Sequence, residues 1–474
     1  MRKSIKLALA ATMALSATSA FATNGDNLIG LGAKSRAMGG TGIAHYGGAE
    51  SATSNPALIA KGKGTRFSFG GTYFRPDVEV KVSGTVFGTG AYDGSYESRA
   101  KNNVIPFIAL TENLENGFSI GASMFGSAGM GTDWRGAGSG ALNNPDLTPA
   151  FAMAAPTGDL GLYSMRSNLL LLKFSVPIAY GQDNWSVGIA PVMMYGALDI
   201  AFQQPATMGA ANPNTGLPCD PTNPTAIANG CTVFPNGGGN SDVGRGSSND
   251  FGFGFEAGAA YTLPDLGITL GAVYHSAIEM KYEKQISVAS QAFGYGTTNP
   301  QYGVFSDTLE QPAEIGFGLD WTQGDISVTA DYKMIQWGDA EGYEDFNWDD
   351  QDVIALGVEY KMDDLSLRLG FNYAENPIDE STDTGSVTGY PITQGGNSNG
   401  DTINAFNAVM FPAITEMHYT IGAGYQFSKN VGADLAFTYG TSDDEKYSAQ
   451  SVGLGTLEVT NDQIAVSGNL NYTF

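Results

Sequence analysis

The sequence lacks the long apolar runs that α-helical membrane proteins need. After its first residues, no segment approaches about 18 consecutive apolar residues, the length that reads as a candidate transmembrane helix. Basic residues are also scarce, since 23 Lys and Arg stand against 48 Asp and Glu, for a formal charge of -25. An acidic chain of this kind is a poor partner for nucleic acid, whose phosphates attract positive charge.

Cysteine and histidine are rare as well. Cys219 and Cys231 lie in a stretch rich in Pro, Asn and Gly, and in an exported protein we expect one disulfide to close a short loop there. His45, His275 and His418 are far apart and lack metal-ligand spacing. We therefore expect no metal, no cofactor and no enzymatic activity, and a Ser/His/acid site assembled across strands stays open as the alternative.

The N-terminus has the pattern of a secretory signal peptide. A basic head precedes the apolar run Leu7–Leu15, and Ala20–Ala22 has the small-x-small form of a cleavage site. We expect residues 1–22 to be removed and the mature chain to begin at Thr23.

Alternation with a period of two dominates the rest of the chain. The closing segment Ile464–Phe474 places mostly apolar and aromatic residues on one face and small or polar residues on the other, without a break. The segments 354–360 and 365–371 alternate in the same way. A period of two indicates a β-strand with two unlike faces, and about ten residues are enough for a tilted strand to cross a bilayer.

About fourteen such segments can be traced along the chain. Their expected bounds are 66–82, 96–110, 118–134, 162–180, 185–202, 251–263, 267–282, 312–321, 326–337, 353–361, 365–373, 416–427, 431–439 and 457–474.

Short and long connections alternate between these segments. Short turns such as 362–364 and 428–430 alternate with long connections such as 203–250 and 374–415. This alternation is typical of outer-membrane barrels, which have short periplasmic turns and long extracellular loops. The sequence therefore predicts an all-β fold, a 14-stranded antiparallel transmembrane β-barrel over residues 65–474, in the outer membrane of a Gram-negative bacterium. A soluble sandwich is the alternative.

The third expected strand departs from the alternation. A regular outward face begins it, but Phe125, Gly126, Gly129, Met130 and Gly131 interrupt the pattern. Glycines weaken strand pairing and permit a bulge or a sharp bend. A bend here would open the barrel wall next to lipid, whereas the alternative is a glycine-rich strand without a special role.

Charges of both signs fall at inward positions of the expected strands. They are Glu256, His275, Glu314, Asp320, Asp331, Lys333, Glu359, Arg368, Glu416 and His418. The functional interpretation is a binding or catalytic cluster, and the alternative is a salt-bridged, hydrated lumen, which is ordinary for a barrel. The acidic stretch 339–352 has two interpretations of its own, a calcium-binding site or a solvated loop.

Five stretches carry a resemblance to a known family. They are Asn27–Gly40, Asn55–Ile59, Tyr73–Val80, Gly121–Gly131 and Asn469–Phe474. In these stretches the sequence resembles the FadL/TodX family of outer-membrane transporters for long-chain fatty acids and other hydrophobic compounds.

The resemblance implies a barrel whose lumen is plugged by an N-terminal hatch, here residues 23–64. It places the hatch motif at Asn55, Pro56 and Ala57, and a ligand pocket near Leu28 and Ile29. It also implies that the interruption in the third strand is a kink that makes a lateral gap.

The resemblance further implies facilitated diffusion of a hydrophobic small molecule, with long-chain fatty acids as the first candidate, and lateral release into the membrane. The apolar loop residues expected to capture it are Leu142, Phe151, Met153, Phe202 and Phe234. The segment Tyr195–Ile200 has no Arg or Lys to hold a carboxylate, which favours a neutral aromatic hydrocarbon or alkane as the alternative.

Other classes of function stay open at this point. A porin for polar solutes, an outer-membrane enzyme and an adhesin would all be compatible with a barrel. The expected surroundings are outer-membrane lipid and lipopolysaccharide, and we expect a monomer that binds no nucleic acid.

Overall fold

The computed structural model describes most of the chain after its first residues. The described ranges are 23–85, 91–114, 116–134, 165–205, 240–244, 246–292, 305–382, 386–387, 397–450 and 455–474. The expected signal peptide, the expected disulfide between Cys219 and Cys231, and the loop residues Leu142, Phe151, Met153 and Phe234 lie outside them. Only the backbone of Phe202 is described.

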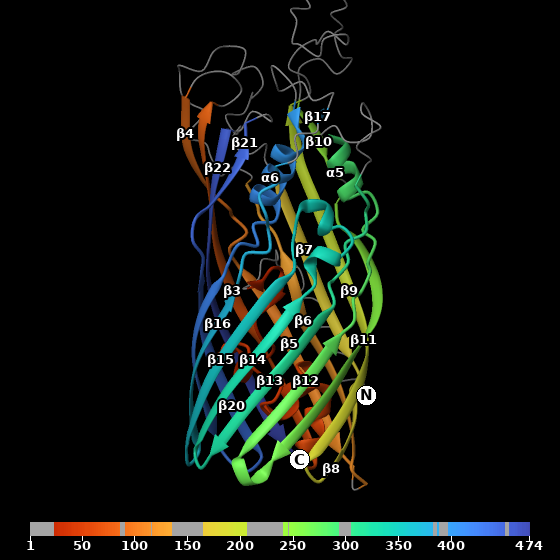
Figure 1. Ribbon diagram of the computed structural model, residues 1–474, viewed down its shortest axis with the longest axis vertical. Helices are drawn as coiled ribbons and strands as arrows, with labels where there is room; N and C mark the ends of the chain where they lie inside the picture. The colour runs from red at the N-terminus through yellow and green to blue at the C-terminus, as the bar shows by residue number, and fades with distance from the viewer. Residues whose placement is uncertain are drawn as a thin grey trace, which may run out of the picture.

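Fourteen antiparallel strands form the barrel, several of them in two pieces (Figure 1). Their elements are β3 (Thr65–Thr85), β4 (Ala91–Glu97) with β5 (Asn103–Asn113), β6 (Phe118–Met130), β7 (Arg166–Ser175) with β8 (Ile178–Gln182), β9 (Trp185–Pro205), β10 (Asn240–Val243) with β11 (Ser248–Leu263), β12 (Ile268–His275), β13 (Glu314–Gln323), β14 (Ile326–Ile335), β15 (Gln351–Met362), β16 (Leu365–Ala374), β19 (Met417–Gln426), β20 (Val431–Thr441) with β21 (Glu445–Ala449), and β22 (Gly455–Thr473). Strand β22 pairs with β3 along its length and closes the barrel. The expected fold class is confirmed.

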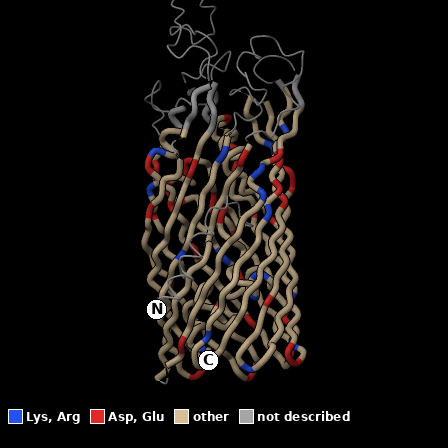
Figure 2. Tube along the Cα trace, turned by 180° about the vertical axis from the view of Figure 1, so that it is seen from behind, with Lys and Arg blue, Asp and Glu red and all other residues tan. Residues whose placement is uncertain are grey.

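The two faces of the wall follow the alternation in the sequence. On β16, Leu367 and Leu369 are exposed on the outer face, whereas Arg368 between them is buried in the interior. Uncharged residues make up most of the wall, and charged residues are scattered along it and at both of its ends (Figure 2). Among the described residues, no helix is both long and apolar enough to cross a membrane.

Three of the expected strand bounds are wrong. The segment 267–282 leaves the ladder after His275, because residues 276–282 turn inward and bury Met280 and Tyr282. The segment 162–180 is split between β7 and β8, where Pro177 has no N–H to donate to the ladder. The segment 96–110 is split between β4 and β5 by residues 98–102.

The connections contain elements that the sequence did not predict. The short turn after β11 is η3 (Pro264–Leu266). The long connections contain α5 (Ile286–Ala292), η4 (Trp337–Asp339), η5 (Glu344–Phe346), the short pair β17 (Ser386–Val387) and β18 (Asn397–Ser398), and α6 (Asn399–Met410). Helices α5 and α6 lie at the upper end of the barrel in Figure 1. The ring of Phe406 in α6 stacks on that of Phe346 at 4.6 Å, and Trp337 packs on Trp348 at 5.1 Å. This apolar layer is called the cap below.

The N-terminal segment, residues 23–64, contacts the inner face of the wall. It contains β1 (Thr23–Asn24), β2 (Asn27–Leu28), α2 (Ala33–Ala37), η1 (Gly48–Thr53) and η2 (Pro56–Lys61). Helix α2 packs against β16, β19, β20 and β22, while η1 and η2 pack against β5, β6, β8, β9 and β11. Wall glycines make this approach possible, since a Cβ at Gly370 would lie 2.0 Å from the amide nitrogen of Gly39.

Candidate functional site

Strand β6 changes its register in the middle of the wall. Its pairing with β7 shifts between Gly126 and Ala128, so that Ser127 is an extra residue. From Phe125 to Met130 every residue is buried, in place of the alternation seen earlier in the strand. The interruption expected from the sequence therefore coincides with a β-bulge, a feature that bends a strand. Its part in a ligand pathway stays a prediction.

The ladder between β5 and β6 ends at this bulge. Pairing runs from Asn113–Ser119 to Phe107–Phe125 and goes no further, although β5 continues to pair with β3 as far as Asn103. The side chain of Ile105 fills the space beyond, because a Cβ at Gly126 would lie 2.6 Å from Ile105 Cγ2. Next to it, Val104 is 58% exposed on the outer face. The apolar side chain of Ile105 thus lies where the backbone ladder between β5 and β6 has ended.

The N-terminal segment supplies a substitute partner for β6. Asn27 of β2 pairs with Ala128, and the amide of Gly129 donates to the carbonyl of Asp26 at 3.1 Å. Leu28 packs in one buried cluster with Phe74 and Ile105, so the hairpin β1–β2 lies directly behind the missing stretch of ladder.

A cavity lies on the inner side of this hairpin. It has about 780 Å³ of empty space, part of it open to solvent, and it is lined by Leu28, Leu31, Ile43, Met194 and Ile278 together with several polar groups. Leu28 and Leu31 also contact the cluster around Ile105. Apolar surface is therefore continuous from the cavity to the outer face of the wall.

The charged groups of the cavity are paired. Lys173 Nζ lies 3.2 Å from Glu256 Oε1, and Lys333 Nζ lies 3.6 Å from Glu314 Oε1. His275 Nδ1 lies 3.8 Å from the same Glu314 oxygen. The cavity thus presents two lysines, each with a carboxylate partner. Among the described residues, no group of three or more His, Cys, Asp or Glu side chains is arranged to hold a metal ion.

Asp26 joins the hairpin to the cap. Its carboxylate is buried and accepts hydrogen bonds from the Tyr343 hydroxyl and from Gln311 Nε2, the latter at 3.2 Å. Gly25 lies against Trp337, since a Cβ there would be 2.6 Å from its ring, and its positive φ of 63° favours glycine. Burial raises the pKa of the Asp26 carboxyl to about 7, although both hydrogen bonds act in the opposite direction.

Asn55 anchors the N-terminal segment to the wall. Its Oδ1 accepts from the amide of Ala57 at 3.0 Å, and its Nδ2 donates to the carbonyl of Ile43 at 2.7 Å. The same Nδ2 lies 3.3 Å from the carbonyl oxygen of Ala259 in β11. Pro56 follows at the first position of η2, where its missing N–H costs nothing. The motif Asn55–Ala57 is therefore a structural joint.

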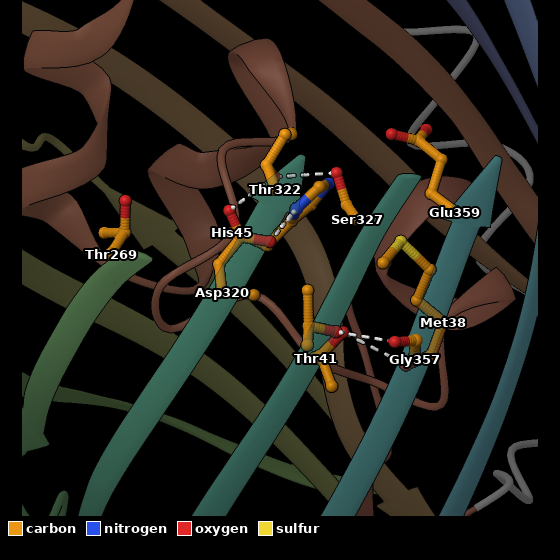
Figure 3. A network of polar contacts seen from close by, with 12 residues as sticks. Met38, Thr41, His45, Thr269, Asp320, Thr322, Ser327, Gly357 and Glu359 are labelled. Atoms are coloured by element: carbon orange, nitrogen blue, oxygen red, sulfur yellow. Dashed lines mark hydrogen bonds and ion pairs between the residues drawn. The ribbon is translucent and has the colours of Figure 1, made fainter. Parts of the chain in front are cut away.

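A second joint holds the middle of the segment to β13 and β14. His45 Nδ1 lies 3.0 Å from Asp320 Oδ1, and Thr322 bonds both Asp320 and Ser327 (Figure 3). The amides of Gly42 and Ile43 donate to Asp331 Oδ2 at 2.7 and 3.0 Å. The inward acids at 320 and 331 thus serve to position the segment.

The other expected inward charges fall into separate groups. Arg368 contacts Glu359 at 2.8 Å and Asp434 at 2.7 Å, away from the cavity. Glu416 accepts from the amide of Asn376, and His418 is fully buried beside β20. Only His275, Glu314 and Lys333 line the cavity together.

Some residues of the site were missed in the sequence. Lys173 follows a run of four leucines and lines the cavity. A lone lysine in such an apolar strand could have identified it as an inward-facing site residue. Ile105 and Asp26 gave no signal, because their importance depends on contacts between segments far apart in the chain.

The fold and its interior define an outer-membrane β-barrel transport protein. The chain belongs to the family described as "Outer membrane protein transport protein (OMPP1/FadL/TodX)", which it matches over residues 7–389. Its location is the outer membrane, which it crosses repeatedly with β-strands.

Two curated relatives are similar to this chain. Outer membrane protein P1 of Haemophilus influenzae is 20% identical over 428 residues, which cover 81% of this chain and 79% of that protein. An uncharacterized protein of Chlorobium limicola, from the 5' region of a phosphoenolpyruvate carboxykinase gene, is 42% identical over 85 residues. That match spans 18% of this chain and 42% of the relative's length.

Solved structures share the fold. The toluene transporter TodX of P. putida has a TM-score of 0.60 at 20% identity, over 94% of this chain and 99% of that one. A FadL homologue of Pseudomonas aeruginosa has a TM-score of 0.64 at 15% identity, over 95% of this chain and 100% of that one. At these identities the likeness supports the fold alone.

Proposed function

We propose that this barrel mediates facilitated diffusion of hydrophobic small molecules, which leave sideways through the wall between β5 and β6. The observation that carries the proposal is the missing ladder beyond Phe107–Phe125, occupied by the side chain of Ile105. Burying apolar groups is worth about 0.8 kcal/mol per CH₂, so a route lined by Leu28, Leu31 and Ile105 suits a hydrocarbon better than a wet pore does.

The N-terminal segment acts as a hatch in this scheme. Its joints at Asn55 and His45 are fixed to the wall, while the hairpin β1–β2 covers the inner mouth of the route. A ligand in the cavity reaches Ile105 only when Leu28 moves. No covalent step and no energy source is needed.

Long-chain fatty acids are the first candidate substrates, and Lys173 and Lys333 are the cations that a carboxylate would meet in the cavity. Each lysine already has a glutamate partner, so a carboxylate would have to compete for it. A neutral aromatic hydrocarbon or alkane needs no such exchange. This pairing supports neutral hydrocarbons as the second candidate.

Uptake of radiolabelled oleate and of radiolabelled toluene tests the proposal. Cells that produce the protein are compared with cells that lack it and with cells that produce a barrel of another family at the same level. We expect faster uptake of at least one compound, and the ratio of the two rates assigns the substrate class. Equal rates in all three strains for both compounds would remove the transport proposal. The protein is also purified and assayed with ester substrates, because hydrolysis would favour the enzyme alternative.

A further inference from the structure

Arg36 is a buried cation. The residue is 1% exposed, and among the described residues Nη1 has no hydrogen-bond partner. Burial lowers its pKa to about 10, which still leaves it protonated at neutral pH. The equally interior Arg368 is different, since it contacts both Glu359 and Asp434. Among the described residues no carboxylate forms an ion pair with Arg36. A guanidinium in such a place is costly unless another group compensates its charge.

Unpartnered polar atoms gather on the wall beside it. Asn372, His418 and Gln463 lie in one row across the barrel, because Asn372 pairs with His418 and both His418 and Gln463 pair with Gly440. Among the described residues, Asn372 Oδ1 is buried without a hydrogen-bond partner, and the buried ring of His418 has only the side chain of Gln463 beside it as a partner. Arg36 is close enough to His418 to act on it electrostatically. Buried polar groups are normally satisfied, so this row calls for a bound species.

Helix α2 is held firmly against this row. The amide of Gly39 donates to Thr420 Oγ1 at 3.0 Å, and Asn372 Nδ2 donates to the carbonyl of Gly39 at 3.1 Å. A Cβ at Gly422 would lie 2.4 Å from Ala37 Cβ, so the helix touches the strand backbone. With its helix fixed in this way, Arg36 has little freedom to move toward a distant carboxylate.

We propose that Arg36 and the buried polar groups of β16, β19 and β20 form an internal binding site for a monovalent anion, either a halide or a carboxylate. Arg36 supplies the positive charge, while the hydroxyl of Thr438, which has no partner among the described residues, supplies a further donor. The oxygen of Asn372 accepts from water in the same site. These residues do not line the cavity described above, so the anion site is separate from the proposed transport route.

Thermal unfolding of the mature protein in detergent tests the site. The protein is titrated with sodium chloride or sodium octanoate against sodium isethionate at equal ionic strength. A ligand that binds only the folded state raises Tm with its concentration. A rise of several degrees with chloride assigns a free halide, and a rise with octanoate alone assigns a carboxylate. No rise with either anion would overturn the proposal.

Two variants and one crystal experiment sharpen the test. Arg36→Met should abolish the anion-dependent rise, whereas Arg75→Met, which removes an exposed arginine of β3, should keep it in full. An unchanged rise in Arg36→Met would refute the assignment to Arg36. If that variant does not fold, the unaltered protein is crystallised in sodium bromide or with a brominated carboxylate. Anomalous diffraction then shows whether an anion is bound. An anomalous peak beside Arg36 supports the site, and its absence with both compounds overturns it.

Discussion

Asn27 pairs with Ala128 at the place where β6 has lost its neighbour β5. A residue of the N-terminal segment thus completes the ladder of a wall strand from inside the barrel. The hairpin contacts the backbone of β6 at Ala128 and Gly129, and Asp26 bonds it to Tyr343 in the cap. Because the hairpin lies between the cavity and Ile105, it is the element whose movement would connect them.

A disulfide across this bridge should lock the route. Facing residues of an antiparallel pair have Cβ atoms about 4.5–5.5 Å apart, and closest at non-hydrogen-bonded positions, so Asn27→Cys with Ala128→Cys can form a bond after slight adjustment. We expect uptake of the transported compound to fall at least tenfold under oxidation and to recover with dithiothreitol. Each single cysteine variant is the control. Equal uptake by the oxidised and reduced double variant would show that the hairpin does not need to move.

Shortening the side chain of Ile105 should increase uptake. Ile105→Ala removes the group that fills the space beside Gly126, and we expect uptake to rise severalfold, with a loss of stability of about 2–4 kcal/mol, as for other buried Ile→Ala changes. The control is Ile421→Ala, on the lipid-facing side of β19. Initial uptake rates normalised to folded protein in the membrane provide the comparison. Unchanged or lower rates for Ile105→Ala would place the route elsewhere.

Release of the hairpin should depend on pH through Asp26. Its pKa is raised from 3.8 to about 7 by burial, so the docked state binds a proton that the released state loses. The stability of the docked hairpin is therefore full below about pH 4, falls as pH rises toward 7, and is constant above that. Hydrogen exchange of residues 23–31, corrected for the intrinsic rate, should be faster at pH 8 than at pH 5.

The matched variant for this experiment is Asp26→Asn. It keeps the shape of the side chain and cannot ionise, so we expect the pH dependence between 5 and 8 to disappear. A pH dependence of the same size in Asp26→Asn would assign the titration to another group.

The ion pairs of the cavity should influence substrate choice. Lys333→Met with Glu314→Gln removes one cation together with its partner, which avoids leaving a charge buried alone. If the cavity holds a carboxylate, oleate uptake should fall severalfold while toluene uptake stays within twofold. The same changes made in the pair Lys81 and Glu458, at the upper end of β3 and β22, provide the control. Equal effects on both compounds would show that Lys333 does not contact a head group.

The wall of this barrel could be predicted closely from sequence, and its interior could not. Alternation over segments such as 464–474 is set by lipid on one face and the lumen on the other, so it is visible in a single strand. The split at Pro177 and the inward turn after His275 depend on local backbone and on what packs behind it. The bond between Asp26 and Tyr343 joins residues far apart in the chain, and neither residue type marks it.

Filling the bulge tests lateral release most directly. In Gly126→Val with Gly129→Val, the first valine meets Ile105 and the second stands where the backbone of β6 meets Asp26. Gly468→Val, at a wall position of β22 with its nearest neighbour atom at 3.3 Å, is the control for adding a side chain to the barrel.

Uptake of labelled oleate and toluene is measured for the three proteins, with heat-modifiable migration on gels as the check of folding. We predict that the double variant folds and loses uptake at least tenfold, while Gly468→Val transports as the unaltered protein does. Undiminished uptake by the folded double variant would contradict release through this part of the wall.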